Sequence, residues 1–564
     1  MDRLIVIMSK KIFYICIILL YSSTIISQNT IEYQKEKLPQ EHLFLHVNGN
    51  LFLTGESLYY TIYCLDAKKN TPSLLSKIAY VELINSDQKS ISKQKINLKK
   101  GIGFSDLFLS SSIKTGTYKL ISYTQWMRNE QRFFEENIYV VNPFADKLEH
   151  VKTLDSINTK KAYTFKNTQF LKPKTDKNTY SKREKIKLFF NTENIENISI
   201  SVKKTNEIEL PTTPKTSFLE ANSIKNNKIS KTFYIPEFRG ELIQGKISSS
   251  NNLEVGNKNI AISFGGENSL TKIVTTNKNG IFYFSIDKPY SANEVVVEVL
   301  DNNQYTISLN EDKGLHITFS NFDKLELTEA LRIYIKEQSK YIQIENAYNS
   351  VKQSSYSKEN KNKPVFYDNS NTTTYVLDDF KRFKTIKEVA VEILKDVWIV
   401  NENNEQRFRL RDVDLVSEKN LETLLIVDGF IINNHSDFIS FDALKIKTIK
   451  VIQEKYFFGN KLYQGIIDIK TFDKNYQNKS KKSQKFSLLK PEQEKNYYHP
   501  NYEVLKNKNI PDFRTQLLWL PKINKSTKEI FFYSSDIVGK FKVEIQGYTK
   551  SGQPIFEEHF FTVK

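Results

Sequence analysis

The sequence predicts a mainly β protein of several domains, in which two-sheet sandwiches dominate and one small domain combines helices with strands. Three observations predict this fold class. Short stretches of alternating apolar and polar residues recur along the chain, separated by turn residues. One stretch toward the C-terminal third instead combines a capped helix with a continuous apolar strand. The 564 residues, 39% of them hydrophobic, are enough for several packed cores.

Residues 1–27 predict a signal peptide for export. Lys10 and Lys11 supply positive charge, Ile12 to Leu20 form an apolar run too short to span a membrane, and the small polar residues 22–27 suit cleavage before Gln28. After cleavage Cys64 is the one cysteine left, so no disulfide can form within the chain. We therefore expect an exported protein in the periplasm or associated with the outer membrane.

The formal charge of +17 raises nucleic acid or anionic lipid as partners. The lysines are spread along the whole chain among Asn, Ser and Glu, and no nucleic-acid-binding motif occurs, so we expect no nucleic-acid partner. The densest basic stretch, 474–490, is interpreted as a solvated basic linker.

The first sandwich is expected at 41–145. Its predicted strands share an alternating pattern and are 43–47, 58–62, 79–83, 116–123 and 138–141. The stretches LTGESLYYTIY at 53–63, YVELINSDQ at 80–88 and GTYKLISYTQWMRN at 116–129 resemble the second macroglobulin-type domain of bacterial envelope proteins. The resemblance implies that Gly55 turns the chain before a core strand and that Tyr118, Tyr123 and Trp126 fill the core.

A second immunoglobulin-like sandwich is expected to start within 171–205, where a D…Y…RE.I.L pattern runs from Asp176 to Leu188 and a strand follows at 198–202. A separate C-terminal sandwich is expected at 500–564. There the string DFRT.L.W.P … F.F..SD..G.F.V resembles a strand set of the same macroglobulin-like proteins. Asp512 and Arg514 are expected to form a structural ion pair in this region.

Between these lies a third sandwich, expected at 234–312. Its pattern G.I … N..I.I … T…NG.F.F resembles the carboxypeptidase regulatory-like domain, with no zinc-peptidase ligand set beside it. Asn279-Gly280 predicts a hairpin turn, because both residues tolerate positive φ. A helical linker is expected next, at 326–353.

The mixed domain is expected at 376–472. Thr385 and Glu388 predict a capping box for a helix with Ile386, Val389 and Ile393 on one face. Strands are expected at 397–400, 407–411, 424–427, 446–452 and 465–470, with Asp428-Gly429 as a turn. The segment that begins with Val427-Asp428-Gly429 and ends with Gly465 to Thr471 resembles the second half of the plug domain of TonB-dependent receptors. The chain ends 92 residues after Phe472, too soon for a transporter barrel.

We assign no catalytic, cofactor-binding or metal-ligating residue. The chain has no H-E-x-x-H, C-x-x-C, G-x-S-x-G or P-loop motif and no macroglobulin thioester sequence. Asp378-Asp379 and Asp428 are interpreted as turn residues, and Cys64 lies in a predicted strand. His435 and Asp437 share a predicted loop and are the remaining pair that could form a site.

The resemblances together imply a non-enzymatic exported envelope protein that acts in recognition or scaffolding at the outer membrane, without a transmembrane span of its own. Strand-edge contacts and surface complementarity would serve the binding. The expected partners are envelope proteins, an outer-membrane barrel transporter among them. Two alternatives stay open: an accessory component of a TonB-dependent transport complex, and a relative of macroglobulins that binds proteases without a covalent bond.

Overall fold

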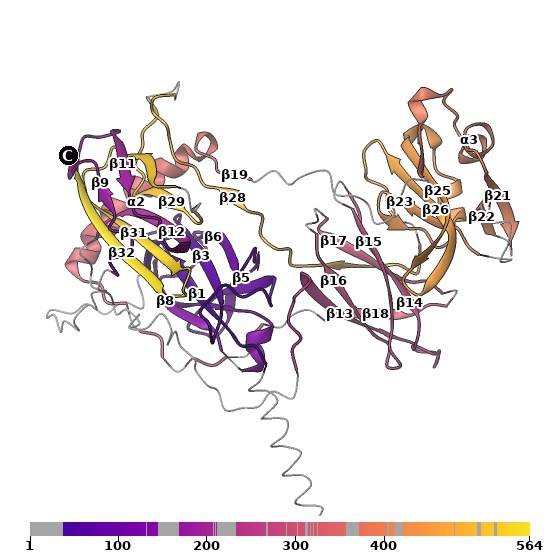
Figure 1. Cartoon of the computed structure of the whole chain (residues 1–564), viewed down its shortest axis with the longest axis horizontal. Coiled ribbons are helices and arrows are strands. Elements are labelled where there is room, and N and C mark those ends of the chain that lie inside the picture. Colours follow the sequence, from indigo (N-terminus) through magenta and orange to yellow (C-terminus); the bar gives the residue numbers. More distant parts are fainter. Residues whose placement is uncertain are drawn as a thin grey trace, which may run out of the picture.

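The computed structural model describes residues 38–144, 168–206, 233–356, 372–411, 421–504 and 509–564, together with 208 and 210. Left out within these ranges are 131, 267–268, 289, 291, 302, 311–313, 316, 320, 324, 403–404, 479 and 524–526. The predicted signal peptide lies outside the described residues. Figure 1 shows two lobes: the first lobe holds both chain ends of the described part, and the second lobe holds the middle of the chain.

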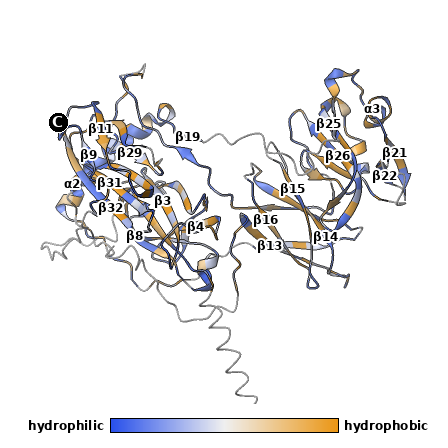
Figure 2. Ribbon diagram, in the orientation of Figure 1, coloured by the Kyte–Doolittle hydropathy of each residue, from blue (hydrophilic) through white to orange (hydrophobic). Residues whose placement is uncertain are grey.

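The first sandwich consists of two sheets, as predicted. One sheet has the order β1-β3-β6 and the other β2-β8-β7-β4-β5. The strands are β1 (Glu41–Val47), β2 (Leu51–Leu53), β3 (Ser57–Asp66), β4 (Ile78–Ile84), β5 (Ser90–Asn97), β6 (Ile102–Phe108), β7 (Gly116–Tyr123) and β8 (Phe134–Val141). Apolar side chains fill the space between the sheets, and hydrophobic residues recur along these strands in Figure 2. Tyr118 belongs to this core as expected, whereas Tyr123 is buried in a separate cluster with Phe319, and Trp126 is buried outside both clusters. The 3-10 helix η1 (Trp126–Asn129) follows β7.

The second sandwich corrects the predicted division of the chain. The segments 171–205 and 500–564 do not form separate sandwiches but build one between them, with sheets β10-β32-β31-β12-β29 and β30-β11-β9. Ile200 of the first segment pairs with Leu520 and with Ile545 of the second. The strands are β9 (Lys174–Thr175), β10 (Thr179–Tyr180), β11 (Lys185–Phe189), β12 (Ile195–Lys204), β29 (Gln516–Leu520), β30 (Glu529–Tyr533), β31 (Gly539–Thr549) and β32 (Pro554–Val563). Strands β9 to β12 bury their apolar faces only when β29 to β32 complete both sheets.

The third sandwich, in the second lobe, has the sheets β16-β13-β18 and β15-β14-β17-β27. The strands are β13 (Glu241–Ser248), β14 (Asn259–Phe264), β15 (Leu270–Thr275), β16 (Ile281–Ile286), β17 (Glu294–Val299), β18 (Thr306–Leu309) and β27 (Gln484–Ser487). The predicted hairpin at Asn279-Gly280 is wrong, since β15 and β16 belong to different sheets and the turn carries the chain from one sheet to the other. Gly280 alone has positive φ there, at 75°.

The stretch 474–490 is not the solvated linker that its charge suggested. Its residues 484–487 form β27, whose Phe486 pairs with Val295 at the edge of the third sandwich. Tyr476, near the start of the stretch, is buried in the mixed domain. Lys485, the one lysine of β27, lies on its exposed side, while Gln484 and Phe486 lie on the less exposed side, so a basic residue is compatible with this strand.

The mixed domain has a five-stranded sheet, β20-β25-β26-β23-β24, covered on one face by helices and a β21–β22 hairpin. Its elements are β20 (Thr372–Val376), η3 (Leu377–Asp379), α3 (Ile386–Glu392), β21 (Val397–Glu402), β22 (Glu405–Leu410), β23 (Leu424–Val427), β24 (Phe430–Ile431), α4 (Ser436–Ile439), η4 (Ala443–Lys445), β25 (Ile446–Phe458) and β26 (Lys461–Thr471). The capping box of Thr385 and Glu388 at α3 is confirmed. The predicted strands are confirmed as well.

The other face of this sheet packs on the third sandwich. Leu424, Ile426 and Ile466 contact Ala261 and Ile273 in one apolar cluster. Hydrogen bonds join the same layers, because Thr271 Oγ1 donates to the carbonyl of Gly429 (2.6 Å) and the backbone N–H of Ile431 donates to Ser263 Oγ (3.2 Å). The second lobe is therefore a stack of layers and not two independent beads.

The predicted helical linker is a packed element of the first lobe. It contains α2 (Glu329–Ala347) and the 3-10 helix η2 (Asn349–Val351). Thr328 caps α2, and Leu331 and Ile342 are buried against β2 and β8. A short two-stranded sheet follows, β19 (Ser355–Tyr356) with β28 (Lys495–Asn496). In the described part of the chain no helix is both long and apolar enough to cross a membrane.

A buried polar seam joins the two lobes at the start of the third sandwich. Glu237 is 2% exposed, and its Oε1 accepts hydrogen bonds from the backbone N–H of Leu242 (3.0 Å) and from Tyr80 of the first sandwich (3.2 Å). Glu241 forms an ion pair with Lys95 of β5. Burial raises the pKa of Glu237 to about 8, with the charge of Glu241 adding to the rise, so this carboxyl is mostly protonated at neutral pH.

Candidate functional site

A cleft of about 600 Å³ opens in the first lobe between the first sandwich, α2 and β29. We call it the inter-sandwich cleft, because segments from both sandwiches form its walls. Its walls include Glu56 just before β3, Tyr59 in β3, Asp106 and Phe108 in β6, and Gln338 in α2. Residues 495–498 and 513–519 close it from the C-terminal part of the chain.

Aromatic rings form one wall of the cleft. Tyr59 stacks on Trp519 with ring centroids 5.9 Å apart and meets Tyr497 edge to face at 5.0 Å. Tyr341 of α2 stacks on Phe513 at 5.5 Å. Burial raises the pKa of Tyr59 to about 12 and also raises that of Tyr497, so both phenols stay neutral hydrogen-bond donors.

Polar groups line the floor of the cleft. Gln338 Nε2 donates to Glu56 Oε1 (2.9 Å) and to Thr515 Oγ1 (3.2 Å), which links α2 to both sandwiches. Asn48 donates to Gln516 Oε1 (3.1 Å). The indole nitrogen of Trp519 has no acceptor among the described residues although the side chain is buried.

Charges of both signs stand at the rim. Lys495 forms an ion pair with Asp106 (2.8 Å), and Lys352 pairs with Glu345 (2.8 Å). Burial raises the pKa of Glu345, although the ammonium of Lys352 opposes the rise. Phe108 and Tyr356 add rings that are 54% and 58% exposed, so the rim offers apolar contact to a partner.

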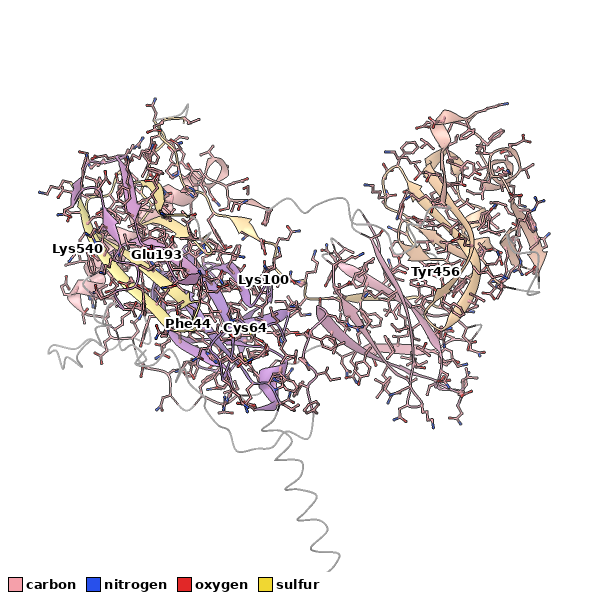
Figure 3. The ribbon with its side chains drawn as sticks, in the orientation of Figure 1. Phe44, Cys64, Lys100, Glu193, Tyr456 and Lys540 are labelled. Atoms are coloured by element: carbon pink, nitrogen blue, oxygen red, sulfur yellow. The ribbon has the colours of Figure 1, made fainter. Side chains whose placement is uncertain are left out.

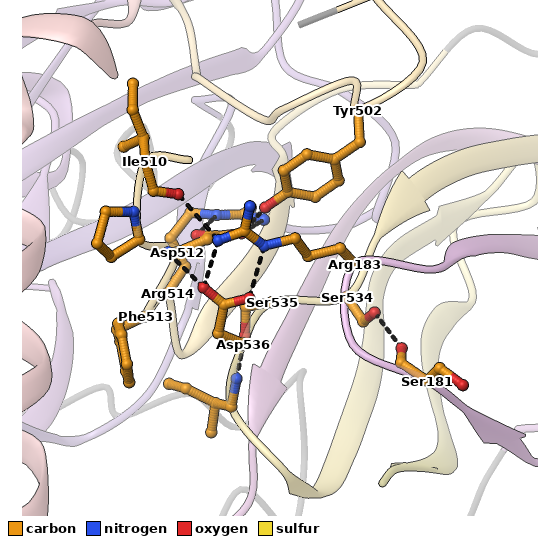
Figure 4. Close-up of polar contacts among 12 residues, drawn as sticks. Ser181, Arg183, Tyr502, Ile510, Asp512, Phe513, Arg514, Ser534, Ser535 and Asp536 are labelled. Atoms are coloured by element: carbon orange, nitrogen blue, oxygen red, sulfur yellow. Dashed lines mark hydrogen bonds and ion pairs between the residues drawn. The ribbon is translucent and has the colours of Figure 1, made fainter. Parts of the chain in front are cut away.

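A network of ion pairs holds the chain beside the cleft (Figure 4). Arg514 forms the predicted pair with Asp512, through two contacts of 2.7 Å. Arg183 binds Asp536 in the same bidentate manner, at 2.6 Å for each contact. The two pairs are joined, since the backbone N–H of Asp512 donates to Asp536 Oδ2 (2.8 Å). Tyr502 also donates to Asp512.

The residues of this network come from two motifs that lie far apart in the sequence. Arg183 belongs to the D…Y…RE.I.L pattern and Asp536 to the SD of the C-terminal string, and the shared sandwich brings them together. Burial alone would raise the pKa of Asp512, but the Arg514 guanidinium holds it below its ordinary value. The pKa of Asp536 is likewise held low by Arg183.

The remaining residues considered from sequence have structural surroundings. Asp428 is fully buried with φ 47°, and its carboxylate accepts from the backbone N–H (2.9 Å) and hydroxyl (2.6 Å) of Thr471 and from the backbone N–H of Tyr476 (3.1 Å). The turn role of Asp428 is confirmed, and this contact joins the two ends of the VDG-to-GIIDIKT stretch. Asp378 and Asp379 lie in η3, where Asp378 contacts Arg382 at 3.6 Å.

His435 and Asp437 do not form a reactive pair in a loop. His435 occupies the N-cap position of α4 without a side-chain capping bond, and its Nδ1 accepts a hydrogen bond from the backbone N–H of Phe408 (3.0 Å). Burial lowers the pKa of His435 to about 3, so the ring is neutral at physiological pH. Burial also raises the pKa of the Cys64 thiol well above its ordinary value. The described residues contain no group of His, Cys, Asp or Glu suited to hold a metal ion.

The sequence did not single out the cleft. Its one local signal is Gln338, which interrupts the apolar face of α2 between Ile335 and Ile342 and is 4% exposed. A buried polar residue on an apolar helix face needs partners from other elements. The other cleft residues come from distant segments, and no local pattern relates them.

No protein-family model matches the chain, and no curated protein matches it. Among solved structures, Salmonella alpha-2-macroglobulin reacted with methylamine is 9% identical, with 93% of this chain and 23% of that protein covered and a TM-score of 0.16. Escherichia coli alpha-2-macroglobulin activated by porcine elastase is 9% identical, with 93% and 44% covered and a TM-score of 0.23. Dimeric latent PorU from Porphyromonas gingivalis is 10% identical, with 48% and 33% covered and a TM-score of 0.16.

The chain spans less than half the length of the proteins just named. Their TM-scores are too low for any conclusion about fold or function to rest on them. The fold class follows from the described elements themselves, which make this a mainly β protein of several sandwiches with one mixed domain.

Proposed function

We propose that the protein is a non-enzymatic, exported recognition protein of a bacterial envelope, and that the inter-sandwich cleft binds its partner, an envelope protein. The observation that carries this proposal is the surface chemistry of the cleft. Stacked aromatic rings, side-chain amides and paired charges meet there, and aromatic anchors inside a polar rim are typical of protein-binding surfaces.

The rigidity of the first lobe supports this role. Both sandwiches, α2 and the β19–β28 pair contribute to the cleft walls, and buried contacts fix the sandwiches together. The hydroxyl of Tyr63 in β3, for example, lies within hydrogen-bond distance of Ser199 Oγ (2.8 Å) and of the carbonyl of Gln546 (3.1 Å) in the second sandwich. A preformed site loses less conformational entropy on binding.

The proposal includes no enzymatic role. Burial keeps the imidazole of His435 and the thiol of Cys64 in their neutral forms at physiological pH. Burial likewise keeps the phenols of Tyr59 and Tyr497 protonated in the cleft. We therefore assign the cleft a binding role.

Two other roles remain predictions. The chain could assist a TonB-dependent transport complex, which purification of a barrel protein with the tagged chain would favour. It could also bind proteases without a covalent bond. That role would protect a protease's large substrates and leave its small ones unprotected.

The test is crosslinking of the tagged full chain in intact outer membranes, followed by identification of the captured proteins. Tyr356→Ala and Phe108→Ala remove exposed rings at the cleft rim and should not disturb the core. Tyr283→Ala is the matched control, since Tyr283 is 46% exposed on β16 in the other lobe. Loss of one captured protein with the two rim variants, and its retention with the control, supports the proposal. Identical capture by all variants contradicts it.

A further inference from the structure

A second cavity, of about 440 Å³, lies where the loop before β2 meets the end of β12 and the β31–β32 pair. We call it the lysine pocket, because four lysines, Lys203, Lys204, Lys540 and Lys542, outnumber the two carboxylates that also line it, Glu544 and Glu558. Figure 3 labels Lys540 on the outer strand pair of the first lobe. Lys203 also lines the inter-sandwich cleft, so the pocket and the cleft share one side chain.

Two of the four lysines have acidic partners. Lys204 forms an ion pair with Glu337 (3.1 Å). Lys542 lies between Glu544 (2.6 Å) and Glu558 (3.1 Å), which raise its pKa although burial opposes the rise. These charges are already neutralised within the protein.

Lys203 and Lys540 are different. Neither ammonium has a carboxylate within 4.0 Å in the described part of the chain, and each lies over an aromatic ring. The Lys203 nitrogen is 4.6 Å from the centre of the Phe52 ring, and the Lys540 nitrogen is 4.5 Å from that of Phe560. A ring face attracts a cation but leaves its hydrogen-bond donors unused.

The Lys203 side chain is partly buried where the pocket and the cleft meet. Burial lowers the pKa of Lys203, and the negative charge of Glu56 opposes this shift. Gly49 makes room for it: a Cβ atom at that position would lie 3.2 Å from the Lys203 nitrogen. A partly buried cation that has no carboxylate within ion-pair distance is stabilised when an anion joins it.

We propose that the lysine pocket binds a small oxyanion, the carboxylate or phosphate group of a ligand, with Lys203 as the inner contact and the exposed Lys540 as the outer one. Asn50 adds a side-chain amide to the pocket wall. The ligand supplies the negative charge that these two lysines lack within ion-pair distance. The inference does not rest on the partner proposed above, and the shared Lys203 places the anion beside the cleft.

The experiment is calorimetric titration of the full chain with inorganic phosphate, and separately with citrate as the carboxylate probe, at low and at high salt. We expect saturable binding of at least one probe to a single site, weakened by salt. Lys203→Met keeps the aliphatic stem over Phe52 and should weaken binding about tenfold or more, as should Lys540→Met. The control is Lys246→Met, since Lys246 is exposed on β13 in the other lobe.

Binding of phosphate alone, or of citrate alone, would identify which oxyanion the pocket takes. Absence of saturable binding of both probes to the natural chain would overturn the proposal. Equal affinity of the natural chain and both pocket variants would overturn it too, because the anion would then sit elsewhere. Lys540 is exposed, so Lys540→Met keeps the test valid if Lys203→Met proves unstable, as thermal unfolding would reveal.

Discussion

Replacing Glu237 with glutamine should make the stability of the protein less dependent on pH between about 5 and 8. Glu237 is buried in the seam between the lobes, and its pKa is raised from 4.5 to about 8. Glutamine has the shape of the protonated carboxyl, and its carbonyl can still accept from Leu242 and Tyr80. The variant should therefore keep the contact and lose only the ionisation.

The sign follows from the raised pKa. Below pH 4.5 the carboxyl is protonated in both the folded and the unfolded chain, so it does not lower stability there. As the pH rises toward 8, the unfolded chain loses this proton while the folded chain keeps it, and unfolding becomes easier. Each pH unit in this window lowers the free energy of unfolding by about 1.4 kcal/mol, which sums to at most about 5 kcal/mol.

The assay is urea unfolding of the full chain at several pH values from 5 to 8, comparing the natural protein with Glu237→Gln. The quantity to compare is the slope of stability against pH, because the variant can shift absolute stability for other reasons. Glu254→Gln is the control, since Glu254 is exposed in the same sandwich. Parallel slopes for the natural chain and Glu237→Gln would refute the reasoning.

Three further predictions concern packing and buried charge. Asp428→Ala should lower the free energy of unfolding by about 2 to 4 kcal/mol in urea titrations, because it leaves three buried hydrogen-bond donors without an acceptor. Asp428→Asn should lower the free energy of unfolding by less. Gly265→Ala should loosen the packing of the mixed domain on the third sandwich, because the added Cβ would lie 2.3 Å from the Phe430 ring. Faster hydrogen exchange of the β24 amides would show this loosening. Adding Phe430→Ala to the variant should relieve the clash. Alanine variants of Arg183 and Asp536 should show a coupling of about 0.5 to 3 kcal/mol in a double-mutant cycle, and simple additivity would contradict the bidentate pair.

Local features of the chain were predictable because they depend on interactions between residues that are close together in the sequence. The capping box of Thr385 and Glu388 depends on atoms three residues apart, and the pattern predicted it. The turn at Asp428 and the ion pair of Asp512 with Arg514 were predicted for the same reason. Alternation of apolar and polar residues likewise predicted most strands of the first sandwich, because it reports which face of a strand is buried.

The hairpin at Asn279-Gly280 shows where a local signal stops. Positive φ at Gly280 gives the turn, but whether the flanking strands pair depends on the sheets beyond them. The stretch 474–490 shows the same limit, because its basic composition, with Lys485 on the exposed side of β27, gave no sign of the inner face of that strand. In both cases the local pattern left the partner strand undecided.

From the sequence alone we could predict the fold class, the capping box of α3, the turn at Asp428 and most strands, since each depends on neighbours along the chain. The pairing of 171–205 with 500–564 in one sandwich, which brings Arg183 to Asp536 and encloses the cleft and the lysine pocket, emerged from the three-dimensional structure. The physical reason is that strands pair through backbone N–H and C=O groups, which are the same in every residue except proline. The sequence of a strand therefore contains little information about which distant strand it pairs with.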